Sequence, residues 1–264
     1  MFHISGQQVS CAAKQIKERN VNYPGDWAVI VPMANEEAEF GEFTELLARV
    51  LDRIGSGTVY FVVDKASKDA TLEMSQALSA RDGRFRTIWA PEDRNVVDAY
   101  LRGYKEAYDR GHDPIIEMDA GLSHDPRALP MFLRVLNEGN ECAFGSRFIN
   151  GGSISDSSKS RWFLSKTGTV LANLLLGTHM YDMTSGFQGF HRSVVAQFLK
   201  YPLLSKAHFY QTELRYLLRK KRYAEIPVHY RAPSPRVSQG AIMNSISVLF
   251  HYFIQRITFR SKRI

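Results

Sequence analysis

Four short apolar runs in the first half of the chain, each followed by a segment with helical spacing, constrain the fold more than any other feature of the sequence. They are WAVIVP at 27–32, TVYFVVD at 58–64, FRTIWA at 85–90 and DPIIEMD at 113–119. Runs of this length predict buried strands. Because strands that alternate with helices form parallel sheets, we expect an α/β fold with a mostly parallel sheet and helices on both faces.

The helices between these runs are predicted from periodicity and from capping residues. Apolar residues recur at helical spacing from Glu36 to Ile54. Ser67 or Asp69 is the candidate N-cap of the next helix, and a third helix is expected to end at Gly111. A fourth helix is predicted near RALPMFLRVL.

The second half of the chain has a looser pattern after CAFGSRF at 142–148. GGSISDSSKS at 151–160 predicts a polar loop. Helices are expected from about Trp162 and from Gln211 to Lys221, followed by a strand at AEIPVHY.

The last twenty residues, SISVLFHYFIQRITFRSKRI, place their apolar side chains largely on one helical face and carry several basic residues. Such a basic amphipathic helix lies on a membrane surface or packs on its own domain, and both alternatives stay open here. We expect an N-terminal extension at 1–26, one α/β domain at 27–240 and a basic amphipathic tail at 241–264.

Composition narrows the class of protein and its partners. A chain of 264 residues can bury one sizeable core. The formal net charge of +7 indicates an anionic partner, but no basic helix or aromatic platform motif favours nucleic acid. Cys11 and Cys142 have neither metal-ligand nor disulfide spacing, which fits a reducing compartment. The chain shows no signal peptide and no apolar stretch of about 18 residues. We expect a cytoplasmic protein, either soluble or peripheral on the cytoplasmic face of a membrane.

Polar residues follow the predicted strands directly. Residues 32–36, Asp64 and Asp119 all lie at carboxyl ends of strands. In open α/β sheets ligands bind beyond these ends. The sequence therefore predicts a nucleotide-like ligand in the first half.

Several motifs then match one family in the same order along the chain. They are VPMANEE, VVDKASKDAT, MDAGLSHDP, GSRFINGG, DMTSGFQGFHR and EIPVHYR. Together they resemble the family 2 glycosyltransferases of the GT-A fold, and among them the dolichyl-phosphate mannosyltransferase-like group that uses polyprenyl phosphates. The resemblance covers roughly residues 27–240.

The resemblance implies an inverting hexosyltransferase that moves a sugar from a nucleotide-sugar to a polyprenyl (dolichyl- or undecaprenyl-type) phosphate. Two alternatives remain: a relative that glycosylates a saccharide hydroxyl, and a non-catalytic nucleotide-sugar or lipid-binding relative. Departures from the pattern keep the last alternative open. They are Ala34, Lys65, Gly121 and Gln188, which stand where tyrosine, aspartate, aspartate and arginine are usual.

The resemblance also implies roles for individual residues on the donor side. The set expected to bind the donor nucleotide is Pro32, Asn35, Glu36, Asp64 and Asp119. The alternative is a purely structural role, in which these residues cap turns or helices. Asn35 fits this structural role best.

Asp119 is also the expected metal ligand and a catalytic residue, since it would face the diphosphate. A divalent cation, Mg²⁺ or Mn²⁺, needs one or two carboxylates beside phosphates and waters. Gly121 leaves the second carboxylate missing. Glu117, Ser123 and His124 are candidates to complete the site, and neutralisation by arginine and lysine without metal is the other possibility.

On the acceptor side, the resemblance implies that Arg147, Arg161 and Ser165 bind the acceptor phosphate, and that Arg147 is also a catalytic residue. Arginine suits this role because its planar guanidinium binds two phosphate oxygens at once. Asp182 is a candidate catalytic base, but it equally fits a residue that orders its loop. A phosphate oxygen is already anionic, so this acceptor needs no strong base.

Overall fold

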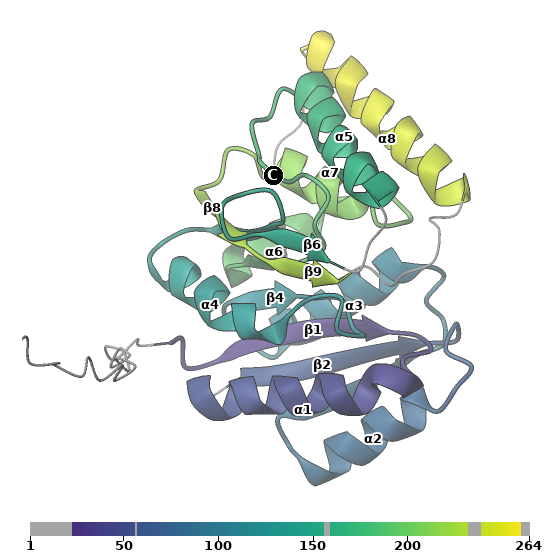
Figure 1. The fold of residues 1–264 in the computed structure, drawn as a ribbon, viewed down its shortest axis with the longest axis vertical. Helices are drawn as coiled ribbons and strands as arrows, with labels where there is room; N and C mark the ends of the chain where they lie inside the picture. The colour runs from purple at the N-terminus through teal and green to yellow at the C-terminus, as the bar shows by residue number, and fades with distance from the viewer. Residues whose placement is uncertain (1–22, 56, 156–158, 232–238, 260–264) are drawn as a thin grey trace, which may run out of the picture.

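A seven-stranded sheet forms the centre of the computed structural model, which describes residues 23–55, 57–155, 159–231 and 239–259 (Figure 1). Its strand order is β3-β2-β1-β4-β7-β5-β8. The strands are β1 (Trp27–Met33), β2 (Gly57–Asp64), β3 (Phe85–Ala90), β4 (Ile115–Glu117), β5 (Cys142–Ser146), β7 (Gln188–Phe190) and β8 (Tyr223–Pro227).

All pairs in this sheet are parallel except those of β7, which runs antiparallel to both β4 and β5. A second, two-stranded parallel sheet pairs β6 (Ser153–Ser155) with β9 (His229–Arg231). The expectation of a mostly parallel sheet is confirmed. The prediction of a loop over the whole of 151–160 is wrong at β6, because pairing with the distant β9 determines that strand.

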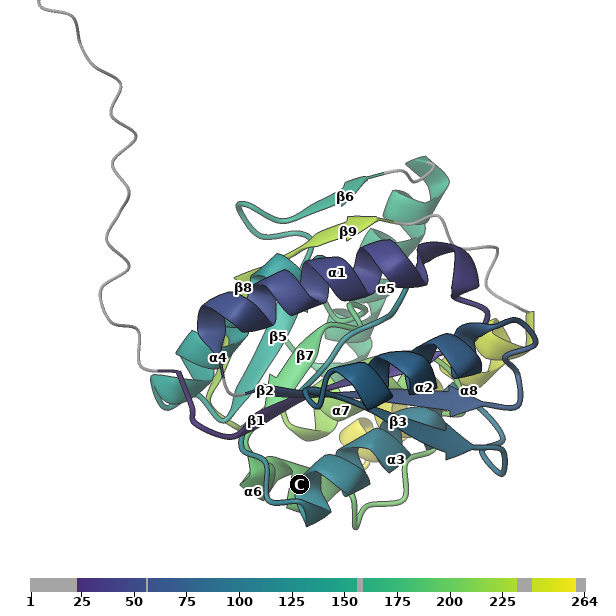
Figure 2. The same ribbon diagram turned by 90° about the horizontal axis from the view of Figure 1, so that it is seen from below.

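Helices cover both faces of the main sheet. One face carries α1 (Glu37–Ile54), α2 (Thr71–Arg81) and, after the short helix η1 (Pro126–Ala128), α4 (Leu129–Asn137). The other face carries α3 (Val96–Asp109), α6 (Arg192–Phe198) and α7 (Tyr210–Leu217). Figure 2 shows α1 on one side of the strands and α3 with α6 on the other.

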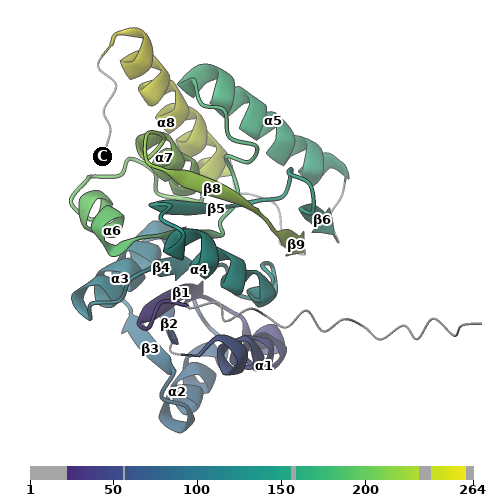
Figure 3. The same cartoon turned by 90° about the vertical axis from the view of Figure 1, so that its left-hand side faces the viewer.

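Two longer helices complete the second face. The helices α5 (Lys159–Leu176) and α8 (Gln239–Ile257) lie side by side near α7, at the end of the molecule away from α1 and α2 (Figures 1 and 3). The inner face of α8 is buried through Val248, Leu249 and Tyr252. The helix α8, which forms most of the described part of the tail, therefore packs on the domain along this face.

The two cores follow from the alternation of side chains along each strand. In β1, Trp27, Val29 and Val31 join the core under α1 and α4, whereas Ala28 and Ile30 join the core under α3. Both faces of this strand are buried, which is why its sequence is a continuous apolar run rather than an alternating one.

Several predicted boundaries shift. The N-cap of α2 is Ala70 rather than Ser67 or Asp69, although the Asp69 carboxylate accepts a hydrogen bond from the Thr71 N–H at 3.1 Å. The strand predicted to reach Asp119 ends as β4 at Glu117, so that Asp119 lies in the loop beyond the sheet.

Candidate active site at the strand ends

A cavity of about 1010 Å³ opens beyond the carboxyl ends of β1, β2 and β4 and is lined from both halves of the chain. The predicted site residues that line it are Pro32, Glu36, Asp64, Asp119, Arg147 and Ser165. The side chain of Arg161, in α5, lies outside the described residues. The fold therefore brings donor-side and acceptor-side candidates to one cavity.

Asp119 presents its carboxylate at the base of this cavity. The Tyr100 hydroxyl donates to Oδ1 at 2.5 Å, and the Asp119 N–H donates to Nδ1 of His124 at 3.0 Å. Burial alone would raise the pKa of Asp119, but the hydrogen bond from the Tyr100 hydroxyl and the positive charge of the nearby Arg147 lower it below its usual value. The side chain keeps 27% of its surface exposed. Asp119 is thus an ionised group open to a ligand.

His124 accepts a hydrogen bond from the backbone of Asp119 and lies in the core. Its ring is fully buried between Phe187 and Tyr230, and burial lowers its pKa. Because Nδ1 accepts the Asp119 N–H, the ring is neutral with its proton on Nε2. This arrangement uses His124 to position the loop after β4, not to bind a metal.

Glu117 has partners in the core instead of the cavity. Its carboxylate is fully buried and accepts hydrogen bonds from the Tyr210 hydroxyl at 2.6 Å and from Nε2 of Gln188 at 2.9 Å. Burial raises its pKa to about 8. This pairing gives Gln188, one of the departures from the family pattern, a structural partner.

On the donor side Asn35 follows β1 and Asp64 ends β2, and of the two Asp64 lines the cavity. The Asn35 side chain donates to the Ala66 carbonyl at 3.2 Å and accepts from the Lys68 N–H at 2.8 Å. Oδ1 of Asp64 accepts from the Ala66 N–H at 2.7 Å. Both side chains therefore order turns, and their contact with a donor nucleotide stays a prediction.

Glu36 also lies on the donor side and shares the cavity with Asp119. Burial raises its pKa to about 7, with further contributions from the negative charges of Glu39, Asp119 and Asp69. The proximity of these carboxylates makes the donor end of the cavity a place that favours a cation.

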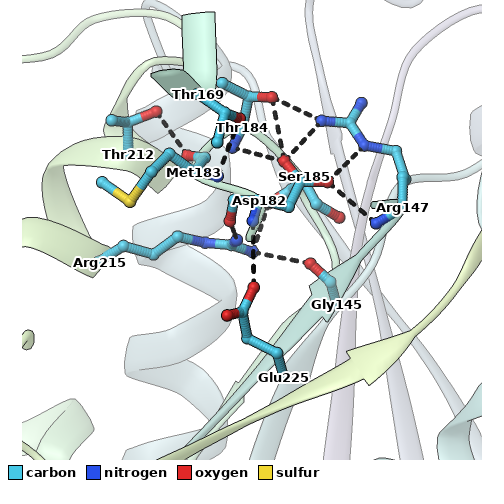
Figure 4. Close-up of polar contacts among 10 residues, drawn as sticks. All are labelled: Gly145, Arg147, Thr169, Asp182, Met183, Thr184, Ser185, Thr212, Arg215 and Glu225. Atoms are coloured by element: carbon cyan, nitrogen blue, oxygen red, sulfur yellow. Dashed lines mark hydrogen bonds and ion pairs between the residues drawn. The ribbon is translucent and has the colours of Figure 1, made fainter. Parts of the chain in front are cut away.

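Arg147 and Asp182 form a buried ion pair on the acceptor side (Figure 4). Nε of Arg147 donates to Oδ2 of Asp182 at 2.7 Å, and Nη2 donates to Oδ1 at 2.9 Å. Nη2 also donates to the Thr184 hydroxyl at 2.5 Å. Burial alone would raise the pKa of Asp182, but the Arg147 guanidinium holds it far below its usual range. Asp182 therefore positions Arg147, and its role as a base stays an untested prediction.

A second layer fixes the loop that carries Asp182 (Figure 4). The fully buried Arg215 donates to the carbonyl oxygens of Asp182 and Ser185, the latter at 2.8 Å. Glu225 accepts the Asp182 N–H at 3.0 Å, and the Thr212 hydroxyl donates to the Met183 carbonyl at 2.7 Å. Sequence reasoning missed Arg215 and Glu225. The signals in the sequence were an arginine within the α7 segment and the position of Glu225 at the start of the EIPVHYR motif.

The lining also contains residues that no motif indicated. Gln211 lines the cavity from the first turn of α7, and His208 lines it from just before this helix. A Cβ added at Gly186 would lie 2.6 Å from Nε2 of Gln211 and 3.0 Å from Oδ1 of Asp119. Basic side chains from several loops contribute to the lining: Lys65, Lys68, Arg94, Arg147 and Lys206. A cavity with a carboxylate end and several cations suits a metal-bound or cation-bound diphosphate.

Within the described part of the chain, no helix has the length and apolar character needed to cross a bilayer.

Comparison with known proteins identifies the family. The sequence profile of Glycosyl transferase family 2 matches residues 28–199. An undecaprenyl-phosphate mannosyltransferase of Micrococcus luteus is 27% identical over 203 residues, which cover 76% of this chain and 82% of that protein. A polyprenol monophosphomannose synthase of Mycolicibacterium smegmatis is 27% identical over 228 residues, covering 84% and 83%.

Solved structures agree on the fold. Glucosyl-3-phosphoglycerate synthase of Mycobacterium tuberculosis in complex with UDP aligns with a TM-score of 0.63 at 16% identity, covering 86% of this chain and 79% of that one. The same enzyme with Mn²⁺, UDP and phosphoglyceric acid aligns with a TM-score of 0.60 at 16% identity, covering 89% and 78%. Because the family profile matches residues 28–199, more than half of the chain, the chain belongs to glycosyl transferase family 2.

Proposed function

We propose that this protein transfers a sugar, with inversion, from a nucleotide-sugar to a polyprenyl phosphate. The two relatives are named for mannosyl transfer to such lipids, and the aligned structure binds UDP. The donor would lie over the ends of β1, β2 and β4, where Asp119 and the cavity's basic residues face its diphosphate.

The observation that carries this proposal is the position of α5 and α8 at the mouth of the cavity. Leu164 and Ser165 of α5 and Ala241 and Ser245 of α8 line it. Large apolar side chains on the outer surfaces of the two helices remain exposed: Phe163, Val170, Leu171 and Leu174 on α5, and Met243, Ile246, Phe250 and Ile254 on α8. We call these residues the apolar face. An acceptor with a phosphate head and a prenyl chain matches a charged cavity bordered by such a face.

The apolar face also fits a membrane surface. Leu174 and Phe163 keep 72% and 65% of their surface exposed. Large exposed apolar patches mark sites of interaction with membranes or other proteins. Arg256 binds the neighbouring helix: its Nη1 donates to the carbonyl oxygens of Leu174 and Leu175, both at 2.9 Å, and so caps α5. Peripheral attachment would therefore rest on apolar contact by both helices, and the basic residues at 260–264 lie outside the described chain.

The donor end fits a divalent cation with few protein ligands. The described residues contain no cluster of three or more His, Cys, Asp or Glu side chains suited to a metal, so donor phosphate oxygens would complete the coordination around Asp119. A bound Mg²⁺ or Mn²⁺ would neutralise the charge of the departing nucleoside diphosphate. The aligned structures that contain Mn²⁺ and UDP support this use of metal.

The acceptor end orients an oxygen that is already anionic. Arg147 lines the cavity while Asp182 holds one edge of its guanidinium, so the cation is fixed before any ligand arrives. A phosphate held there attacks the anomeric carbon opposite the leaving diphosphate and needs no general base. Ser165, and Arg161 by resemblance, would complete this subsite.

The test is a transfer assay with a panel of labelled nucleotide-sugars and a short-chain polyprenyl phosphate, with and without Mn²⁺ or Mg²⁺. We expect lipid-linked product from the phosphorylated acceptor and none from the matching prenol. Transfer to a saccharide instead of the lipid would establish the hydroxyl-acceptor alternative. Nucleotide binding without any transfer would establish the non-catalytic one.

A further inference from the structure

Gly121 lies two residues after Asp119, where the family pattern usually has a second aspartate. Its φ is +64°, in the left-handed region. A Cβ added here would lie 3.4 Å from Cδ of Glu36 and 3.7 Å from Oε1, and Oε2 would be closer still. The Glu36 carboxylate thus occupies the space in which a side chain at position 121 would begin.

Glu36 reaches this space from a different strand. It follows β1, whereas Gly121 follows the neighbouring β4, with Ile30 of β1 paired to Glu117 of β4. The Glu36 N–H donates to the Thr71 hydroxyl at 2.8 Å, and its side chain makes no capping hydrogen bond to α1. The backbone is anchored, while the carboxylate points into the cavity shared with Asp119.

We propose that Glu36 supplies, from the loop after β1, the second carboxylate that the loop after β4 lacks. This inference rests on the metal site of the proposed function and deepens it. The cation would then be held between Asp119 and Glu36, with donor phosphate oxygens as its remaining ligands. Gly121 is required because any side chain at this position would displace the Glu36 carboxylate.

The other acidic and imidazole groups near Asp119 are committed elsewhere. Both Glu117 oxygens accept hydrogen bonds in the core, and Nδ1 of His124 accepts the Asp119 N–H. Oxygen is the ligand that Mg²⁺ and Mn²⁺ prefer, and two carboxylates meet the usual protein share of such a site. Glu36 is the carboxylate whose position matches the missing one.

The first experiment measures Mn²⁺ binding by electron paramagnetic resonance, with Mn²⁺ alone and with Mn²⁺ plus UDP or GDP. We expect Glu36→Gln to weaken Mn²⁺ binding by roughly 10- to 100-fold, by analogy with changes around characterised metal sites. Glu42→Gln is the matched control, because Glu42 is an exposed carboxylate further along α1 and is not among the charges that act on Glu36. It should bind Mn²⁺ as the wild-type protein does.

The second experiment moves the carboxylate from position 36 to position 121. Gly121→Asp alone should disturb the site, because the new side chain competes with Glu36 for one space. The double variant Glu36→Ala with Gly121→Asp should recover Mn²⁺ binding to within about threefold of the wild-type protein. Aspartate is among the few residues that tolerate a left-handed backbone, so this variant remains compatible with the loop.

Wild-type Mn²⁺ affinity in Glu36→Gln would overturn the inference, whether or not the double variant folds. A folded double variant that does not recover Mn²⁺ binding would also overturn it. These outcomes are separable from failure of the proposed function. Metal binding that depends on Glu36 without lipid transfer rejects only the function, whereas transfer that persists in a chelator, with no Mn²⁺ bound, rejects only the inference.

Discussion

Asp119 and Asp182 are two aspartates beside the same cavity, yet they differ in what satisfies them. Both oxygens of Asp182 are bound by Arg147, and its side chain is fully buried. Asp119 receives one hydroxyl hydrogen bond at Oδ1 and keeps 27% of its side chain exposed. Asp182, whose charge is neutralised by Arg147, stabilises the structure of the site. Asp119, whose carboxylate is open to the cavity, is available to bind a ligand.

The same contrast separates the two ends of the cavity. At the acceptor end, cation and carboxylate are paired before any substrate binds, with Arg215 holding the loop beneath them. At the donor end, Glu36 and Asp119 line the same cavity, and burial together with the negative charges of Glu39 and Asp119 raises the pKa of Glu36. The acceptor end is preorganised, and the donor end is completed by what binds there.

Breaking the buried pair should have the largest effect. Asp182→Asn leaves Arg147 buried without its counter-charge, so we expect the free energy of unfolding to fall by about 3–5 kcal/mol. Urea unfolding measures this loss. The matched control is Asp109→Asn, which breaks an exposed pair with Lys105 and should cost below about 1 kcal/mol. Equal effects of the two substitutions would contradict the conclusion that the buried pair stabilises the acceptor end of the cavity.

Asp119→Asn should show the opposite profile. It keeps the shape of the side chain and an oxygen for the Tyr100 hydroxyl, so unfolding should change by less than about 1 kcal/mol. Transfer should fall about 10²- to 10³-fold, equivalent to about 2.7–4 kcal/mol of lost transition-state stabilisation. Initial rates at saturating donor measure it. A variant that loses stability but keeps its rate would place Asp119 with Asp182 as a structural residue.

The apolar face extends the comparison to the membrane. Leu174→Ser and Phe250→Ser should each weaken binding to lipid vesicles about tenfold, since burial of such a side chain contributes about 1.5–3 kcal/mol. Vesicle sedimentation measures the effect, and thermal unfolding should stay unchanged. Met131→Ser, at an exposed apolar position of α4 on the opposite face of the sheet, is the control. Equal losses in all three variants would reject attachment through α5 and α8.

The smallest expected effect concerns a pair whose charge depends on pH. Nδ1 of His191 lies 2.8 Å from Oδ1 of Asp113, and Nε2 lies 3.1 Å from the Leu136 carbonyl oxygen. Both partners are acceptors, so the ring is held protonated, and the hydrogen bond to Asp113 raises the pKa of His191 above 6.5.

Since this pKa is raised in the folded state, the stabilisation is complete below pH 6.5 and is lost as the pH rises through the raised value. The stability difference between wild type and His191→Gln should therefore shrink by about 1 kcal/mol between pH 6 and pH 9. Urea unfolding at several pH values checks this prediction. A difference independent of pH would show that His191 acts without its charge.

The first half of the fold was predictable because its signals are local. Apolar runs and helical periodicity located β1 to β3 and α1 to α3, and the bounds of β3 are those expected. Strand ends then identified residues that the structure brings to one cavity. This part of the site follows from the general geometry of parallel sheets.

What sequence reasoning missed depends on partners far along the chain. β7 is three residues long, too short for periodicity, and pairing with β4 and β5 determines it. In the sequence Arg215 is an ordinary helix residue. Its hydrogen bonds to the loop at 182–185 become apparent only in the structure. Likewise, the sequence alone suggests that a metal ligand is missing at Gly121. The structure places the carboxylate of Glu36, 85 positions earlier in the sequence, beside this glycine.

The antiparallel strand β7 has a consequence for the reaction itself. Gln188 is paired with Glu117 of β4 on one edge and with Phe144 of β5 on the other. Asp119 follows β4 within two residues, and Arg147 follows β5 directly. The two strands are held two spacings of roughly 4.8 Å apart, so in the proposed reaction β7 would set the distance between a leaving group beside Asp119 and an attacking oxygen beside Arg147. Changes in the surrounding loops and helices would then leave this distance unaltered.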